Sequence, residues 1–163
     1  EFAPEEAAVL DAGCGEGIYS LAVLRAIEKA GKTGELIGVD ISKTALQYAA
    51  KRSPAFTLCV ASCAHLPVED GSVDEVLNIF SPFVPEEFAR VLKPGGTFCG
   101  CFYVKGEQRR TDWFVRHIYE KTGFFTPPYE TAFSLKKRLE KLYATVTLGT
   151  VKSIAWFVCR KAK

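Results

Sequence analysis

Two acidic residues and three glycines near the start of the chain have types and spacings that suit the binding of a nucleoside. An apolar run ends in Asp11, and glycines follow at alternate positions, namely Gly13, Gly15 and Gly17. Glycine takes positive φ angles without strain and lets the backbone approach a ligand closely. The next apolar run ends in Asp40, 23 residues after Gly17, near the interval of about 20 residues at which such an acid binds ribose hydroxyls. One ligand can therefore contact both the glycine turn and the second acid.

The spacing and charge of this turn differ from those of a dinucleotide-binding loop. The dinucleotide fingerprint is G-x-G-x-x-G, with a pyrophosphate at the N-terminus of the following helix. Here the pattern is D-x-G-x-G-x-G, and Glu16 adds a second carboxylate within the turn. Two carboxylates repel a pyrophosphate but favour a ligand that carries a sulfonium and an ammonium group. These residues therefore argue against a nicotinamide-dependent oxidoreductase.

Four stretches resemble, in the right order, the motifs of class I S-adenosylmethionine-dependent methyltransferases. They are VLDAGCGEG at 9–17, GVDIS at 38–42, HLPVEDGSVDEVLNIF at 65–80 and RVLKPGGTF at 90–98. The stretch from about 9 to 98 is also similar to bacterial rRNA guanine-N1 methyltransferases, although their N-terminal zinc module has no match in this chain.

The resemblance implies S-adenosyl-L-methionine as the cofactor and no metal. It places the methionine part of the cofactor at Asp11 and the glycine turn, the ribose at Asp40 and the adenine beside Ile41. The implied cofactor-binding residues are Asp11, Gly13, Cys14, Gly15, Asp40, Ile41, Ser62, Cys63 and Asn78.

The stretch SCAHLP at 62–67 departs from the pattern D-A-x-x-L-P of many relatives. Ser62 takes the place of the acid that accepts a hydrogen bond from the adenine amino group. Because a hydroxyl oxygen also accepts a hydrogen bond, we expect adenine binding to be kept. His65 and His117 are expected to be a surface residue and a structural residue.

The stretch NIFSPF at 78–83 corresponds to the place where related enzymes face the transferred methyl group. No catalytic residue is evident, but Asn78 and Phe80 are the candidates. Asn78 could orient the cofactor or the acceptor, and Phe80 or Phe83 could stack on a flat substrate. These aromatic side chains suit packing in the core equally well.

Strand-like and helix-like segments alternate along the chain, which predicts a parallel sheet with helices on both faces. Strands are expected over 7–12, 35–40, 56–61, 74–80 and 97–104, the last beginning after a turn at Gly95 and Gly96. Helices are expected over about 16–30, from Ser42 to Pro54, from Pro82 or Pro85 to Leu92, over 111–122 and near 132–142. Strands at 144–151 and 153–161 are close enough to form an antiparallel hairpin. The expected fold is α/β, Rossmann-like and of the class I methyltransferase type, with a seven-stranded, mostly parallel sheet.

Composition favours a cytoplasmic protein of one domain over 1–163. The longest apolar runs are shorter than the roughly 20 residues that a membrane helix needs, so no membrane partner is expected. The formal net charge of +2 is too small to imply a polyanion, and the basic clusters at 105–110 and 136–141 are expected to be solvated faces. The six cysteines form no C-x-x-C pair and are expected to be reduced core thiols.

The acceptor is either a small molecule or an RNA base, and a monomer or a weak dimer is expected. The chain begins about six residues before the first expected strand, so we expect the N-terminal lid of the family to be short or missing and the cofactor cleft to be open. A catalytically silent S-adenosylmethionine-binding module is the alternative function. Closure by the loop at 124–133 would argue against the open cleft.

Overall fold

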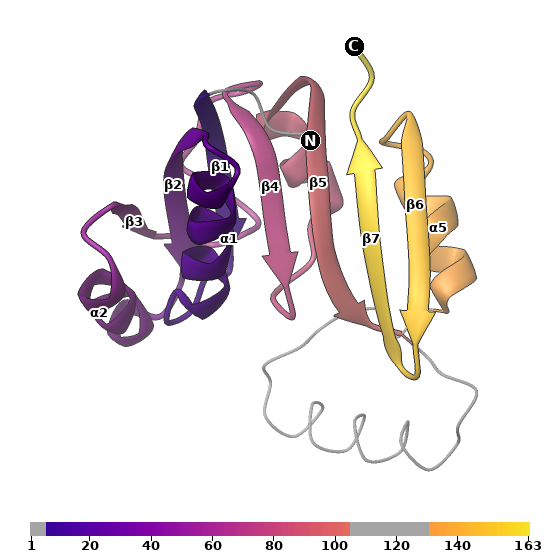
Figure 1. Ribbon diagram of the computed structural model, residues 1–163. Helices are drawn as coiled ribbons and strands as arrows, with labels where there is room; N and C mark the ends of the chain where they lie inside the picture. The colour runs from indigo at the N-terminus through magenta and orange to yellow at the C-terminus, as the bar shows by residue number, and fades with distance from the viewer. Residues whose placement is uncertain (1–5, 105–130) are drawn as a thin grey trace.

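The computed structural model describes residues 6–104 and 131–163, and within them a single sheet carries the fold (Figure 1). Its strands are β1 (Glu6–Ala12), β2 (Thr33–Asp40), β3 (Phe56–Val60), β4 (Val73–Ile79), β5 (Leu92–Tyr103), β6 (Thr145–Val151) and β7 (Ile154–Arg160). The described helices are α1 (Ile18–Lys29), α2 (Lys43–Arg52), α3 (Pro85–Val91) and α5 (Ala132–Leu139).

The strands follow the order β3-β2-β1-β4-β5-β7-β6. The first five are parallel, and β7 is antiparallel to both β5 and β6. After β3 the chain crosses back to place β4 on the other side of β1, so the strand order reverses between β1 and β4. In open α/β sheets, ligands bind outside the carboxyl ends of the strands at such a reversal. The topology therefore directs attention to the turn after β1.

Helices cover both faces of the sheet, as Figure 1 shows: α1 lies over β1 and β2 on the near face, and α3 and α5 lie behind β5 and β6. The far face is packed with aromatic rings, of which Phe88, Phe98, Phe102 and Phe157 are fully buried. On the near face, Ile27 of α1 packs against Val9 and Leu77. Burial of these side chains fixes the register of β1 against its two neighbours.

The predicted fold class and its seven strands are confirmed, with one difference at β5. The expected turn at Gly95 and Gly96 lies inside this strand, which begins at Leu92. Val73 of β4 pairs with Leu92 of β5, and the next pair is Glu75 with Thr97. The extra residues of β5 between these two pairs form a bulge. Gly95 has a φ of 75° there, which a glycine adopts without strain.

Local signals set the helix ends. Ser42 caps α2 as expected, because its side chain accepts a hydrogen bond from the Ala45 N–H at 3.2 Å. Pro85 is the first residue of α3, where the missing N–H of proline costs no hydrogen bond. The helix expected over 111–122, which contains His117, and residues 124–130 of the expected loop lie outside the described residues.

Candidate functional site

The turn after β1 is held to the end of β2 by its backbone. The N–H groups of Gly13 and Cys14 donate to the Val39 carbonyl at 2.8 and 3.0 Å. Gly13, Gly15 and Gly17 have φ angles of 86°, 52° and 75°, a region in which other residues are strained. The three glycines are therefore needed for the path of this turn, as the sequence predicts.

Asp40 connects the turn to the start of α2. Its Oδ2 atom accepts a hydrogen bond from the Gly15 N–H at 2.9 Å, and its Oδ1 atom accepts one from the Ser42 N–H at 2.8 Å. A carboxylate has about four acceptor positions, so two stay available for hydroxyl groups. The carboxylate is thus oriented by the backbone and still able to bind a ribose.

The turn leaves room beside Asp40. A Cβ atom added to Gly15 would meet no heavy atom of residues 6–104 and 131–163 within 4 Å. Ile41, which follows Asp40, is 73% exposed. Open space, an oriented carboxylate and an exposed apolar side chain together fit the ribose and adenine of a nucleoside.

Asp11 lies beneath the turn and is only 2% exposed. Its Oδ2 atom accepts a hydrogen bond from the Ser20 hydroxyl of α1 at 2.6 Å. Burial raises the pKa of the Asp11 carboxyl to about 6, the Ser20 hydrogen bond opposes the increase, and the charge of Asp40 adds to it. The structure thus places Asp11 under the turn, within the electrostatic reach of Asp40.

Both cysteines of the predicted site have buried side chains. The Cys14 sulfur fills the space above Gly38, where an added Cβ atom would lie 2.9 Å from it. Burial raises the pKa of the Cys14 thiol to about 12 and that of the Cys63 thiol to about 11, so both thiols are protonated at neutral pH and are poor nucleophiles. Any contact of theirs with a ligand in this arrangement goes through the backbone.

Ser62 and His65 lie on the exposed loop after β3. The Ser62 hydroxyl accepts a hydrogen bond from the Ala64 N–H at 3.2 Å, and the Ser62 carbonyl accepts one from the His65 N–H at 3.0 Å. The His65 ring contacts the Ala64 carbonyl. The loop thus folds into a tight turn, and His65 is exposed, as the sequence predicts.

Asn78 is fully buried at the end of β4. Its Nδ2 atom lies 3.0 Å from the Ala12 carbonyl, 2.6 Å from the Ser81 hydroxyl and 3.1 Å from the Pro82 carbonyl. The Ser81 hydroxyl donates in turn to the Ala12 carbonyl at 2.6 Å. The amide therefore ties the loop after β4 to the end of β1, and its Oδ1 atom has no partner among the described residues.

Phe80 and Phe83 follow Asn78 but have different surroundings. Phe83 contacts the rings of four other phenylalanines and the guanidinium of Arg138, so it belongs to the far-face core. Phe80 contacts only the ring of Tyr103 among the described aromatic side chains, with centroids 4.8 Å apart. Phe80 directly follows β4 at the edge of the sheet where β1 also ends, whereas the ring of Phe83 packs into the core.

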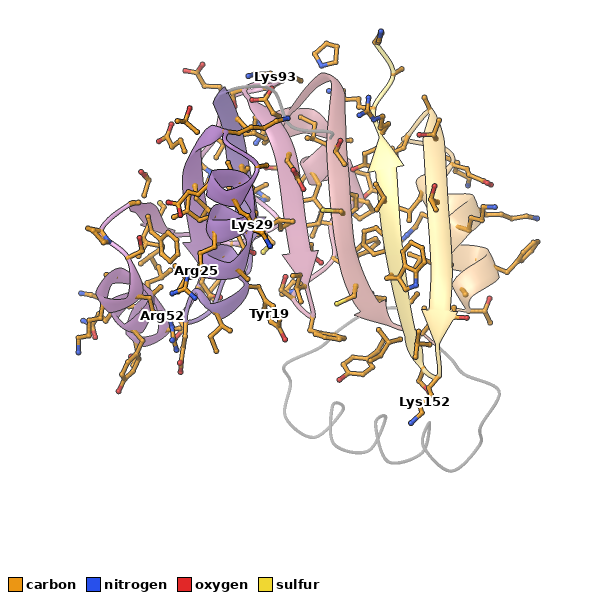
Figure 2. The ribbon with its side chains drawn as sticks, in the orientation of Figure 1. Tyr19, Arg25, Lys29, Arg52, Lys93 and Lys152 are labelled. Carbon is orange, nitrogen blue, oxygen red and sulfur yellow. The ribbon has the colours of Figure 1, made fainter. Side chains whose placement is uncertain are left out.

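Two ionic contacts near the site are absent from the sequence-based prediction. Arg52, at the end of α2, donates from Nε to the Glu16 carbonyl at 2.6 Å and from Nη2 to the Glu16 carboxylate at 3.1 Å. Figure 2 shows Arg52 and Tyr19 near the same end of the sheet, with Lys93 at the opposite end. The Glu16 carboxylate thus has a cationic partner from this chain.

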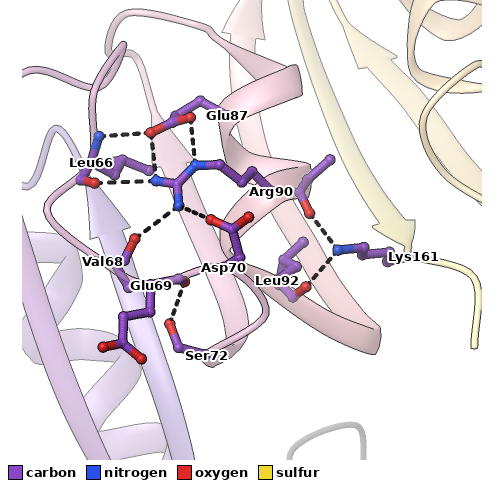
Figure 3. A network of polar contacts seen from close by, with 10 residues as sticks. Leu66, Val68, Glu69, Asp70, Ser72, Glu87, Arg90, Leu92 and Lys161 are labelled. Carbon is purple, nitrogen blue, oxygen red and sulfur yellow. Dashed lines mark hydrogen bonds and ion pairs between the residues drawn. The ribbon is translucent and has the colours of Figure 1, made fainter.

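The second network fixes the segment that follows Ser62 and Cys63 (Figure 3). Arg90 of α3 donates to the carbonyls of Leu66 and Val68 at 3.2 and 3.0 Å and to both oxygens of Glu87 at 2.7 and 2.8 Å. These hydrogen bonds lower the pKa of the Glu87 carboxyl to about 2. No local pattern could reveal this contact, because Arg90 lies 24 residues after Leu66.

A separate hollow of about 420 Å³ lies at the other edge of the sheet, where β1 and β2 begin. It is lined by Ala7, Ala8, Thr33, Gly34, Glu35, Asp74 and Lys93. In the described part of the chain, no three or more histidine, cysteine, aspartate or glutamate side chains are grouped to hold a metal ion. No helix within residues 6–104 and 131–163 is long and apolar enough to span a membrane.

A family model described as a methyltransferase domain matches residues 9–96, the range that contains the glycine turn, Asp40 and the Arg90 network. The chain belongs to this methyltransferase family. It is also similar to the 23S rRNA (guanine(748)-N(1))-methyltransferase of Streptomyces fradiae, with 39% identity over 90 residues. That alignment covers 55% of this chain and 31% of the relative. The chain thus spans about a third of the length of its first curated relatives.

Solved structures show the same fold. The SAM-dependent methyltransferase of Methanosarcina mazei superposes with a TM-score of 0.71 at 19% identity, over 99% of this chain and 95% of that chain. The geranyl diphosphate C-methyltransferase of Streptomyces coelicolor, in complex with Mg²⁺, geranyl diphosphate and S-adenosyl-L-homocysteine, has a TM-score of 0.73 at 14% identity. The latter match covers 98% of this chain and 74% of the Streptomyces chain.

Proposed function

We propose that the chain is one methyltransferase domain that binds S-adenosyl-L-methionine at the turn after β1 and transfers its methyl group. The observation that carries this proposal is the Asp40 carboxylate, held by two backbone N–H groups beside the open space at Gly15. The S-adenosyl-L-homocysteine bound to the Streptomyces neighbour supports the choice of cofactor.

Each residue has a distinct role in this proposal. Asp40 binds the ribose hydroxyls, Ile41 covers one side of the adenine, and Gly15 provides room for the ligand. When bound, S-adenosyl-L-methionine supplies an activated methyl group on its sulfonium, so the protein has mainly to align donor and acceptor. Asp11 contributes a negative potential beneath the turn, which favours a cationic ligand once this carboxyl is ionised.

The backbone of the loops supplies the remaining contacts. Ser62 and Cys63 belong to the turn beside the end of β2 and offer backbone groups and one hydroxyl to the adenine. Asn78 supports the site indirectly, because its amide holds the loop after β4 against the end of β1. No residue of this arrangement is assigned as an acid or a base.

The acceptor is an RNA base or a small molecule. The similarity to the Streptomyces fradiae enzyme, whose name specifies guanine N1 of 23S rRNA, favours a base. The Streptomyces coelicolor neighbour was solved with geranyl diphosphate and favours a small molecule. A cytoplasmic location and a monomer or weak dimer are part of the same proposal.

The experiment is to incubate the protein with S-adenosyl-L-methionine labelled in its methyl group, together with ribosomal RNA or a small-metabolite extract. We expect label in one of the two acceptor fractions and its loss in Asp40→Ala, while Glu28→Ala, which removes an exposed acid of α1, retains it. Label in neither fraction, with cofactor still bound, would contradict the enzyme and favour the silent binding module.

A further inference from the structure

Phe80 has a backbone conformation that is rare for a bulky residue. Its φ angle is 51°, and among the described residues other than glycine only Lys152 shares this sign. A left-handed conformation is unfavourable for a residue with a Cβ atom. Such strain persists only where the surroundings enforce it, and it is concentrated at binding and catalytic sites.

The neighbours of Phe80 enforce this conformation on both sides. Before it, the buried Asn78 amide contacts the Ser81 hydroxyl and the Pro82 carbonyl. After it, the Ser81 hydroxyl donates to the Ala12 carbonyl at 2.6 Å. The Phe80 N–H itself donates to the Cys101 carbonyl at 3.1 Å. A largely buried polar network thus holds one strained phenylalanine at the end of β4.

The strained residue places its ring beside Tyr103 at the end of β5. The ring centroids are 4.8 Å apart and the ring planes meet at 33°, and both side chains are partly exposed. The parallel register pairs Ile79 with Cys101, so the two rings lie at the carboxyl edge that also carries the glycine turn. They are not part of the described buried core.

The residue that follows Phe80 packs on the proposed cofactor turn. A Cβ atom added to Gly13 would lie 2.2 Å from the Ser81 Cβ atom, so the residue after Phe80 packs on the turn itself. Tyr103 pairs with Ile154 of β7, which brings the hairpin tip with Lys152 to the same end of the sheet (Figure 2). An acceptor on these rings would therefore lie at the same carboxyl edge of the sheet as the turn that binds the methyl donor.

We propose that Phe80 and Tyr103 form an aromatic platform that binds a planar ring of the methyl acceptor. This inference rests on the proposed function and narrows its acceptor to a flat, π-rich group. Stacking on an aromatic side chain needs only the face of a ring, so a nucleobase and a small aromatic molecule share the required chemistry. Phe83 does not take part, because its ring packs against Phe88, Phe98, Phe102 and Phe157.

The test is an NMR titration of the full chain with two planar probes, guanosine and 2-naphthol, and with the non-planar cyclohexanol. Each is titrated with and without saturating S-adenosyl-L-homocysteine, which blocks the cofactor's own adenine site. Phe80→Gly removes the ring and accepts the positive φ without strain, so the backbone is kept. Phe133→Ala is the matched control, because Phe133 is 68% exposed on α5. Phe80→Trp restores a ring of larger area.

We expect at least one planar probe to bind, and cyclohexanol not to bind. The dissociation constant of the planar probe should rise about tenfold in Phe80→Gly and in Tyr103→Leu. Phe80→Trp and Phe133→Ala should bind this probe like the wild type. Binding of guanosine alone assigns the platform to a nucleobase, and binding of 2-naphthol alone assigns it to a small aromatic acceptor.

Equal binding of the planar probes to Phe80→Gly and the wild type, or no binding of either probe, would overturn the platform. Failure of the wild type to bind S-adenosyl-L-homocysteine would instead contradict the proposed cofactor. Because the probes are also titrated without it, the comparison of Phe80→Gly with the wild type decides the platform in either case.

Discussion

At the scale of single residues, the Asp40 carboxylate joins three parts of the site: the glycine turn, the start of α2 and the proposed ribose. Asp40→Ala removes a charge-assisted hydrogen bond to the ligand, worth roughly 1.5–3 kcal/mol, so we expect a ten- to hundredfold loss of affinity for S-adenosyl-L-homocysteine. Calorimetric titration measures this loss, with Glu28→Ala as the control. Unchanged affinity in a folded Asp40→Ala protein would show that the carboxylate serves only the turn and the helix.

Asp11 makes the stability of the fold depend on pH. Its pKa is raised from 3.8 to about 6 by burial, so the native state holds this proton more tightly than the unfolded chain does. The contribution to stability is complete below pH 3.8 and is lost as the pH rises through 6, by up to about 3 kcal/mol.

Urea denaturation at a series of pH values measures the contribution of Asp11 to the free energy of unfolding, with Asp11→Asn as the reference. The wild type should lose stability relative to Asp11→Asn between pH 4 and pH 7. In Ser20→Ala the midpoint should move to higher pH, because the Ser20 hydrogen bond holds the pKa of Asp11 down. A constant difference between wild type and Asp11→Asn would contradict the raised pKa.

Gly13 and Gly15 are required for different reasons, which substitution by alanine separates. A Cβ atom at Gly13 meets Ser81 at 2.2 Å, whereas one at Gly15 meets no heavy atom of the described residues within 4 Å. We expect Gly15→Ala to cost only about 1–2 kcal/mol in stability but to weaken cofactor binding at least tenfold, because it fills the space left for the ligand.

Gly13→Ala should cost more stability than Gly15→Ala, and adding Ser81→Gly should recover part of the loss. Thermal unfolding and calorimetric titration of the three variants measure both effects. Normal cofactor affinity in Gly15→Ala would mean that the ligand lies elsewhere.

At the scale of elements, Arg90 fastens the segment after β3 to α3. Arg90→Met removes hydrogen bonds to two carbonyls and leaves Glu87 without its cation, so we expect a loss of about 1–3 kcal/mol in the free energy of unfolding. Arg25→Met, a change at an exposed position of α1, is the control and should cost little.

The same variant changes the response to acid. The pKa of Glu87 is lowered from 4.5 to about 2, chiefly by the Arg90 hydrogen bond. Glu87 therefore stabilises the fold above pH 4.5, and this contribution is lost as the pH falls toward 2. Denaturation at pH 7 and pH 3 should show a smaller acid effect in Arg90→Met than in the wild type. An equal loss of stability between pH 7 and pH 3 in Arg90→Met and in the wild type would contradict this role of the Arg90–Glu87 pair.

The elements also show how far the sequence can predict the structure. The glycine turn, the Ser42 cap and the hairpin depend on neighbouring residues, and the sequence predicts all three. The start of β5 does not depend on neighbouring residues, because the bulge at Gly95 and Gly96 is set by pairing with β4. A pair of glycines predicts a turn equally well in a loop and in a bulged strand.

At the scale of the whole molecule, the order of the strands brings the separate parts of the site together. The reversal of strand order between β1 and β4 places the predicted site residues at one edge of the sheet. The strand order does not predict which side chains face inward, because the residues around Cys14 and Cys63 lie in turns without a periodic pattern. The difference between Phe80 and Phe83 likewise depends on contacts with distant strands and with α5.

The central claim is that the turn after β1 and Asp40 bind S-adenosyl-L-methionine. Calorimetric titration of the full chain with S-adenosyl-L-methionine and S-adenosyl-L-homocysteine, beside NADH and with or without a chelator, tests it most directly. We predict saturable binding of the first two ligands in the micromolar range, unchanged by the chelator, and no binding of NADH. Preferential binding of NADH, or no binding of either S-adenosyl ligand by the folded protein, would contradict the claim.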